Sequence, residues 1–331
     1  MNLFTNVEIS KIRPQIGYGD QLLLMGSCFA TEMGERLKEA KFTCKVNPFG
    51  VLYNPMSIAK SIRQLGKSFS LTGEKIFPNE GLYHSLSFHG DFSATTPEKL
   101  EENIRLSLDA CKNVLTQSSW LLLTFGSAFV YEWKETGEIV ANCHKLPEKL
   151  FNRRRLSVDE IVEEYQQLLP MLWKQNSKLK VMLTVSPIRY LRDGLHENQL
   201  SKATLHLAID TLQQAFPDKV VYFPAYELLM DELRDYRFYA DDLTHPSKMA
   251  VDYIWQRFCE ACCSAETIEM MKSVKEIKKM LEHRPLHPES EEYVKFLHQI
   301  VLKIETLSEK CPYFDFEKEK ELCLTRLNRL H

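Results

Sequence analysis

The chain has 331 residues, of which 44% are hydrophobic and 26% charged, a composition typical of a globular protein with a sizeable core. Its 42 basic and 45 acidic residues give a formal net charge of −3, which excludes a general attraction to nucleic acid or to anionic membranes. The sequence has no apolar run of membrane-spanning length, and residues 1–8 do not resemble a signal peptide. We therefore expect a cytoplasmic protein.

The first 40 residues predict a strand, a tight turn and a helix. Residues 21–25 form a short apolar run that ends at Gly26-Ser27, as a buried parallel strand does. The next twelve residues carry apolar side chains at helical spacing, at Phe29, Met33 and Leu37. The serine therefore lies on the turn between the strand and the helix.

Four further apolar runs predict buried strands along the chain. The strongest is 119–125, which ends at Gly126-Ser127, and another ends at Ser186-Pro187. The predicted strands after the first are 42–46, 119–125, 180–185 and 220–223. Residues 80–93 alternate aromatic and polar side chains and are expected to form a strand or an extended loop.

Helical periodicity separates most of these strands. The clearest helix follows Ser157, a predicted N-cap with Glu160 three residues later. The expected helices are 29–40, 57–66, 98–114, 158–174, 197–215, 226–233 and 246–262. This alternation predicts an α/β fold: a three-layer, flavodoxin-like parallel sheet with helices on both faces. The strand ends at 26–27, 126–127 and 186–187 should then meet at one edge, where such sheets bind ligands.

The composition changes after residue 264. Two charged amphipathic stretches, 265–282 and 291–310, are separated by a segment with two prolines. We therefore predict a catalytic domain at 1–264 and a C-terminal helical appendage at 265–331. The appendage is expected to cover the domain or to form a homodimer contact.

Nine cysteines are scattered over the chain, an odd number that favours reduced thiols over a disulfide framework. The C-x-x-C at Cys259 and Cys262 lies in a helical pattern, and no second pair stands at zinc-finger spacing. We expect these thiols to pack within the helix, and we expect no metal or other cofactor.

Ser27 is the candidate nucleophile. A serine on a sharp turn from strand to helix presents its Oγ atom near the backbone N–H groups of the helix N-terminus. The alternative is that Ser27 only caps the helix. We expect its side chain to be exposed in a cleft at the carboxyl edge of the sheet.

Asp242 and His245 are the candidate acid and base. Pro246 at a first helical position places His245 in the preceding loop, and an aspartate three residues upstream can accept a hydrogen bond from the imidazole. The second imidazole nitrogen is expected within about 2.6–3.2 Å of Ser27 Oγ, while Asp241 faces solvent. The alternative is an ordinary capping cluster at the start of a helix.

Three strings resemble the GSCFA family. They are GSCFA at 26–30, NPFGVLYNP at 47–55 and NCHK at 142–145. The resemblance covers residues from about 20 to about 260 and implies the SGNH (GDSL-like) hydrolase superfamily, mostly esterases, lipases and carbohydrate O-acyl esterases or transferases. It implies that Ser27 is the nucleophile and that the D-x-x-H block is Asp242 and His245.

The superfamily also uses a glycine and an asparagine as oxyanion donors. Gly50 matches the glycine, but the segment after the third strand, 126–129, has no Asn-Asp pair. Asn142 is the best substitute donor, and Ser127 is the second candidate. His144, beside Asn142, is the preferred histidine on the substrate side. Two more histidines, His84 and His89, would face opposite sides of a strand.

The sequence therefore predicts a serine-dependent acyl-ester hydrolase or acyltransferase, of the esterase or O-acyltransferase type. Its substrate is expected to be an O-acylated glycan or a small metabolite ester. One alternative is a catalytically weak SGNH-like binding module that lacks the asparagine donor. Another is a metal-dependent hydrolase built on Asp241, Asp242 and His245, which the absence of H-x-H and H-E-x-x-H spacings disfavours. A homodimer formed through the C-terminal helices is compatible with each.

Overall fold

A five-stranded parallel sheet forms the centre of the protein, as a computed structural model describes it for residues 5–65 and 75–328. The strand order is β10-β9-β5-β1-β2, and every neighbouring pair is parallel. The strands are β1 (Gln21–Gly26), β2 (Thr43–Val46), β5 (Trp120–Phe125), β9 (Lys180–Val185) and β10 (Val220–Tyr222). All five predicted strands are confirmed, and their order is the flavodoxin-like one.

Helices cover both faces because successive strand residues point to opposite sides. Leu22 and Leu24 pack in one apolar cluster with α1 (Cys28–Glu39) and α8 (Lys248–Cys262). Leu23 and Met25 pack in the other cluster, against helices of the opposite face. Those helices are α2 (Pro55–Gln64), α3 (Pro97–Asp109), α5 (Val158–Gln175) and α6 (Leu195–Ala215). The three-layer prediction is therefore confirmed. The predicted helix 57–66 corresponds to α2, and its last residue lies outside the described residues.

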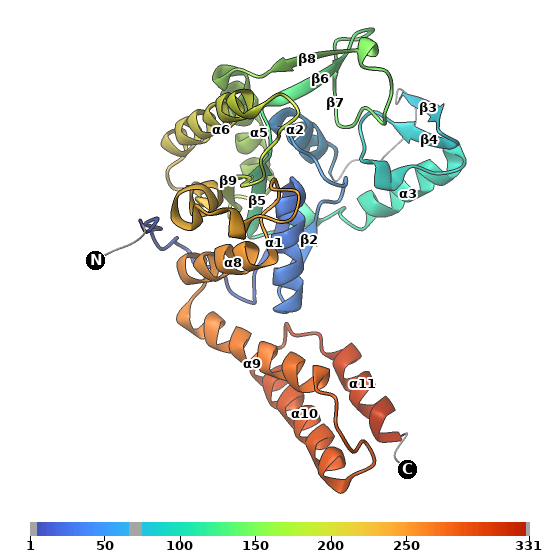
Figure 1. The fold of residues 1–331 in the computed structure, drawn as a ribbon, viewed down its shortest axis with the longest axis vertical. Helices are drawn as coiled ribbons and strands as arrows, with labels where there is room; N and C mark the ends of the chain where they lie inside the picture. The colour runs from blue at the N-terminus through green and yellow to red at the C-terminus, as the bar shows by residue number, and fades with distance from the viewer. Residues whose placement is uncertain (1–4, 66–74, 329–331) are drawn as a thin grey trace.

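Two small antiparallel sheets stand beside the central one (Figure 1). The first pairs β3 (Ile76–Asn79) with β4 (Leu82–Ser85); β4 lies within the stretch 80–93 where a strand or loop was expected, whereas β3 precedes it and was not predicted. The second has the order β7-β6-β8, from β7 (Ile139–Val140), β6 (Phe129–Trp133) and β8 (Phe151–Arg155). The sequence did not predict the second sheet, because β7 has two residues and β8 reads Phe-Asn-Arg-Arg-Arg, with no apolar alternation.

Short helical segments complete the connections. They are α4 (Val114–Gln117), α7 (Ala225–Glu227), the π-helix Leu228–Leu233, and the 3-10 turns Gly90–Phe92, Glu148–Leu150 and Tyr236–Phe238. The helix expected at 226–233 is thus a short α-helix that continues as a π-helix.

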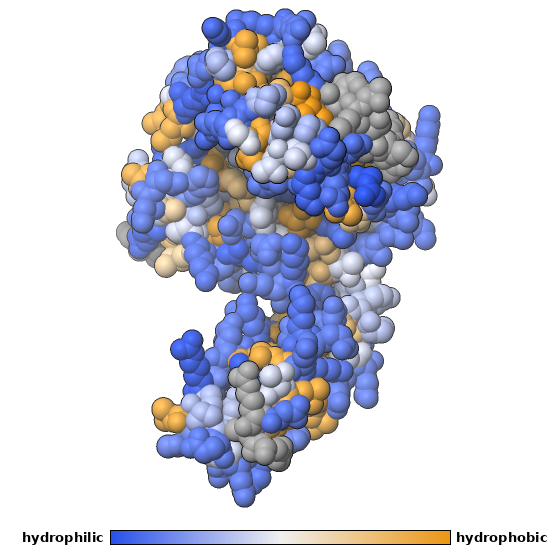
Figure 2. All heavy atoms as spheres, turned by 90° about the vertical axis from the view of Figure 1, so that its right-hand side faces the viewer, coloured by the Kyte–Doolittle hydropathy of each residue, from blue (hydrophilic) through white to orange (hydrophobic). Residues whose placement is uncertain are grey.

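The described part of the C-terminal region is mainly helical, as predicted. It contains α9 (Ala265–Glu282), α10 (Glu291–Lys310) and α11 (Glu317–Asn328). Ile277 of α9 and Ile300 of α10 belong to the same continuous apolar cluster as Ile254 of α8, so these helices pack against the main body. Figure 2 shows a smaller lower body below the larger one, with a mostly hydrophilic surface on this face. The domain limit at residue 264 stays a prediction.

No helix in the described ranges 5–65 and 75–328 combines the length and apolarity that a membrane crossing requires.

β1 lies where the strand order reverses, because the chain continues to β2 on one side and to β5 on the other. Such switch points are where open α/β sheets form crevices for ligands. Gly26 ends β1 there with a φ of +143°, and a Cβ on it would lie 2.2 Å from the Thr124 carbonyl oxygen. Only glycine fits this close approach between β1 and β5.

We expect Gly26→Ala to lower the free energy of unfolding by about 2 kcal/mol or more, because it combines backbone strain with a clash against β5. Chemical denaturation of the two proteins measures this difference. Gly90→Ala is the matched control, because a Cβ on Gly90 has no neighbour within 4 Å. Equal stability of the two variants would contradict the proposed constraint.

Candidate active site

Ser27 stands at the N-cap of α1 but does not cap it. Its side chain makes no capping hydrogen bond, and its Oγ atom is buried without any hydrogen-bond partner. The simple capping role considered for Ser27 is therefore wrong. The expectation of an exposed serine is also wrong, because the residue is 0% exposed. The structure has an enclosed hydroxyl at the positive end of a helix.

Segments that follow three strands enclose Ser27. A Cβ placed on Gly126, after β5, would lie 3.3 Å from Ser27 Cβ and 2.5 Å from Tyr190 Oη. The backbone N–H groups of Gly126 and Ser127 both donate to the Tyr53 carbonyl, at 2.8 and 2.9 Å. The ends of β1 and β5 therefore meet here, as predicted, and Tyr190 comes from the loop after β9.

Lys202 of α6 ties two of these strand ends together. Its Nζ atom donates to the carbonyl oxygens of Gly126 and Ser186, each at 2.7 Å, and the side chain is buried. Burial lowers the pKa of Lys202 from its ordinary 10.5 to about 7, while the nearby Cys28 acts weakly in the opposite direction. The buried amino group of Lys202 therefore fixes the backbone beside Ser27.

Asp242 and His245 form the predicted pair. His245 Nδ1 lies 2.5 Å from Asp242 Oδ2 and 3.1 Å from the Thr244 hydroxyl, which leaves Nε2 for another partner. The backbone N–H groups of His245 and Thr244 hold the pKa of Asp242 well below its ordinary value, and the imidazole adds to this effect. Asp241 is exposed, as expected. The carboxylate thus stays ionised and orients the ring.

The His245 loop lies at the same edge of the sheet as Ser27. The Arg189 N–H, after β9, donates to the Thr244 carbonyl at 3.1 Å. His245 also lines a cavity of about 480 Å³ together with Cys28, the residue after the serine, and Ile188. The expected hydrogen bond between His245 and Ser27 is nevertheless absent, because Ser27 Oγ has no partner. The serine is enclosed, whereas the imidazole is half exposed.

Gly50 and Ser127 are already engaged within the protein. The Gly50 N–H donates to the Asn47 carbonyl at 2.8 Å, and a Cβ on Gly50 would lie 2.2 Å from His89 Cβ. Ser127 Oγ lies 3.3 Å from Ser201 Oγ and accepts from the Phe129 N–H at 3.1 Å. Their roles as oxyanion donors stay predictions. Of the histidines considered, His89 is the one that packs on the Gly50 loop.

Asn142 and His144 take part in the packing of the small sheets. Asn142 Oδ1 accepts from the His144 N–H at 2.8 Å. His144 Nε2 lies 2.7 Å from the Ser85 carbonyl oxygen, its ring stacks on His84 at 4.5 Å, and burial lowers its pKa. His144 is therefore held by contacts within the protein, and its role on the substrate side stays a prediction. Asn142 stays a predicted donor whose side-chain oxygen holds a turn.

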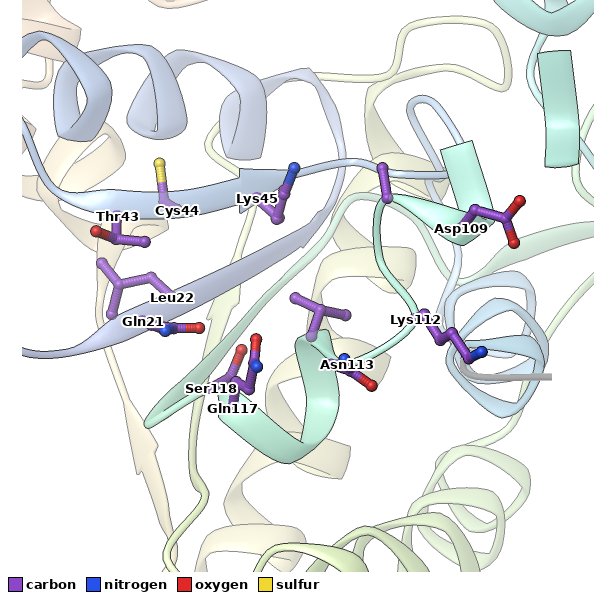
Figure 3. A pocket seen from close by; sticks show the side chains of 12 residues that line it. Gln21, Leu22, Thr43, Cys44, Lys45, Asp109, Lys112, Asn113, Gln117 and Ser118 are labelled. Carbon is purple, nitrogen blue, oxygen red and sulfur yellow. The ribbon is translucent and has the colours of Figure 1, made fainter. Parts of the chain in front are cut away.

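A second hollow, of about 210 Å³, lies at the opposite edge of the sheet (Figure 3). It is lined by the first residues of β1 and β2, Gln21 and Thr43, and by Asn113 and Gln117 near α4. Because Ser27 follows the other end of β1, this hollow is separate from the candidate active site.

All nine cysteines are free thiols, as expected from their number and spacing. Within the described ranges, no group of three or more His, Cys, Asp or Glu side chains is arranged to hold a metal ion.

Sequence reasoning missed Tyr190 and Lys202 as residues of the site. Lys202 carried a usable signal, because it interrupts the buried stripe of α6 between Asn198 and Leu205 at helical spacing. A lysine in such a stripe needs polar partners, and here it finds the two strand-end carbonyls.

The fold defines a three-layer α/β protein whose switch point carries a serine and, on the same edge, an Asp–His pair. The GSCFA family model matches residues 21–258, and the model for the GSCFA domain protein C-terminal domain matches residues 274–329. The chain belongs to the GSCFA family, which confirms the resemblance carried by its three sequence strings.

Solved structures with detectable similarity include two esterases. An acetyl xylan esterase (Est2A) from the rumen bacterium Butyrivibrio proteoclasticus is 12% identical, with a TM-score of 0.39, covering 73% of this chain and 63% of that one. A carbohydrate esterase family 3 protein from Talaromyces cellulolyticus is 11% identical, with a TM-score of 0.32, covering 76% and 98%. The search of curated proteins found no match.

We expect the stability that Lys202 confers to depend on pH. Between pH 7 and 10.5 the unfolded chain holds the lysine proton while the folded protein has lost it, so stability rises with pH through this window. The difference in unfolding free energy between wild type and Lys202→Met should therefore increase from pH 7 to pH 10. Denaturation at several pH values measures it. Lys174→Met, at an exposed lysine of α5, is the control, and a flat difference for Lys202→Met would refute the assignment.

Proposed function

We propose that this protein is a serine-dependent acyl-ester hydrolase or acyltransferase. One observation carries the proposal: a buried, unbonded Ser27 Oγ at the start of α1, on the sheet edge that also holds a formed Asp242–His245 pair. Buried hydroxyl groups normally have hydrogen-bond partners, so an unpaired one at a switch point indicates a role toward a ligand. Membership of the GSCFA family agrees with this function.

The proposed reaction uses the three side chains in the usual roles of a Ser-His-Asp site. Ser27 Oγ attacks the acyl carbon while His245 Nε2 takes its proton, and the leaving alcohol then receives that proton. Water or an acceptor alcohol releases the acyl group from Ser27, which gives hydrolysis or transfer. Asp242 keeps the proton on Nδ1 and stabilises the imidazolium. A local rearrangement must bring the half-exposed imidazole to the enclosed hydroxyl, as site closure does in many enzymes.

The cavity beside His245 supports a hydroxyl-rich substrate. Its lining combines carboxylates such as Glu32 and Asp252 with cations such as Arg36 and Lys248, around apolar side chains. Such mixed donors and acceptors suit sugar hydroxyl groups, so an O-acylated glycan or a small polar ester fits the proposal.

A binding module without catalytic turnover is the second candidate. The observation that favours it is the enclosure of Ser27, together with the internal partners already held by Gly50, Ser127 and Asn142. In that case the same edge would bind an acyl ester without cleaving it.

We expect Ser27→Ala and His245→Ala each to reduce turnover of acetyl and longer acyl esters by at least about 1000-fold, because the triad acts as a unit. The double variant should lose little more than either single variant. Steady-state assays with a panel of esters measure this. Well-folded wild type without turnover would favour the binding module.

A fluorophosphonate probe should label wild type at Ser27 and should not label Ser27→Ala. Cys28→Ala is the matched control at the neighbouring position, and it should label like wild type, because burial raises the pKa of the Cys28 thiol and disfavours the thiolate. Labelling that persists in Ser27→Ala but is lost in Cys28→Ala would identify a different nucleophile.

A further inference from the structure

We propose that the Tyr190 hydroxyl donates a hydrogen bond to the oxyanion that forms when Ser27 attacks an acyl ester, with Lys202 as the residue that positions this site. The inference rests on the proposed function and assigns the donor that the missing asparagine would otherwise supply. Tyr190 is then a catalytic residue, because its hydroxyl would touch the reacting oxygen.

Two side chains with unpaired polar atoms flank Gly126. Tyr190 Oη is buried and without a hydrogen-bond partner, as is Ser27 Oγ. Both side chains border the position that a Cβ on Gly126 would take, at 2.5 Å for Tyr190 Oη and 3.3 Å for Ser27 Cβ. The absence of a side chain at Gly126 therefore keeps the hydroxyl beside the serine. An acyl oxygen bonded through carbon to Ser27 would enter this space.

Three contacts hold Tyr190 in place. Its backbone N–H donates to Asn198 Oδ1 at 3.0 Å, and its ring meets the Tyr53 ring edge to face at 5.9 Å. Lys202 Nζ lies 5.0 Å from the centre of the Tyr190 ring and also binds the Ser186 carbonyl, four residues before Tyr190. A donor fixed in advance stabilises a developing charge without the cost of reorganisation.

The hydroxyl keeps its proton at neutral pH. Burial raises the pKa of Tyr190 well above its ordinary value, Cys28 and Tyr53 raise it further, and the Ser186 side chain opposes this shift without meeting hydrogen-bond geometry. A protonated phenol in a site closed to water is a strong hydrogen-bond donor.

Acylation of Ser27 needs no further reactant. The Ser27 Oγ–carbon bond forms, the carbonyl π pair moves to oxygen, and the Oγ proton goes to His245 Nε2. Tyr190 donates a hydrogen bond to that oxygen and keeps its proton. When the carbonyl re-forms, the bond to the leaving oxygen breaks and that oxygen takes the proton from His245.

The test compares Tyr190→Phe with Tyr226→Phe. Tyr226 is the matched control because its ring also lies near Lys202, at 5.7 Å, but its hydroxyl binds Gln199 at 3.0 Å. Tyr190→Phe should lower kcat about 100-fold with KM changed less than about 2-fold, as for the loss of one oxyanion donor, and Tyr226→Phe should stay near wild type. Inhibition by an alkylboronic acid, which forms a tetrahedral adduct on serine, should weaken to a similar degree in Tyr190→Phe alone.

Stability gives an independent readout. Since Tyr190 Oη has no partner, Tyr190→Phe leaves no group unpaired and should unfold at the same temperature as wild type or higher. Lower kcat with unchanged or raised stability supports the inference. Unchanged kcat in Tyr190→Phe overturns it. A changed KM in Tyr190→Ala would then mean that the Tyr190 ring only shields the serine from solvent. A misfolded Tyr190→Phe also overturns it, because the hydroxyl would be structural.

Failure of the proposed function has a different signature. If wild type is active and labels at Ser27 but Tyr190→Phe equals it, only the role of Tyr190 is wrong. If folded wild type neither labels at Ser27 nor turns over esters, both proposals are overturned together.

Discussion

The two hydrogen bonds from the Lys202 amino group to the Gly126 and Ser186 carbonyls hold the carboxyl edge of the sheet together. Without this amino group, the buried carbonyl oxygens of the loops after β5 and β9 would lose the donor that they share. The position of Gly126, and with it the space beside Ser27, therefore depends on a polar group that the protein buries at a cost. The two apolar clusters on the faces of the sheet offset that cost.

The arrangement of the central sheet was predictable because local sequence patterns indicate its strands. Apolar runs that end in Gly-Ser or Ser-Pro fix the strands and their shared edge, and the D-x-x-H spacing alone places Asp242 against His245. The sheet of β6, β7 and β8 was not predictable, since the strand over 151–155 has a charged sequence and is defined by its pairing with β6. Strand pairing between distant segments leaves no trace in local periodicity.

The details of the site depended on tertiary packing in the same way. Nothing in the strings around residues 27 and 190 shows that Tyr190 reaches the Gly126 backbone beside the serine, because that contact joins loops that are distant in the sequence. The contacts of His144 were unpredictable for a related reason: its hydrogen bond to the Ser85 carbonyl joins two segments that are distant in the sequence.

The C-terminal helices also reach the cavity beside His245. Lys278 of α9 lines that cavity and pairs with Glu39 of α1 at 3.1 Å, while Ile277 joins the apolar cluster of α8. Any molecule that fills the cavity contacts Lys278, which lines the cavity only when α9 is docked against the main body. By linkage, such a molecule must tighten the docking of α9 by the same factor by which the docked helix tightens its binding. Ligand binding at the carboxyl edge of the sheet and docking of the three helices would thus be thermodynamically coupled, so ligand binding should increase the protection of α9 amides from hydrogen exchange.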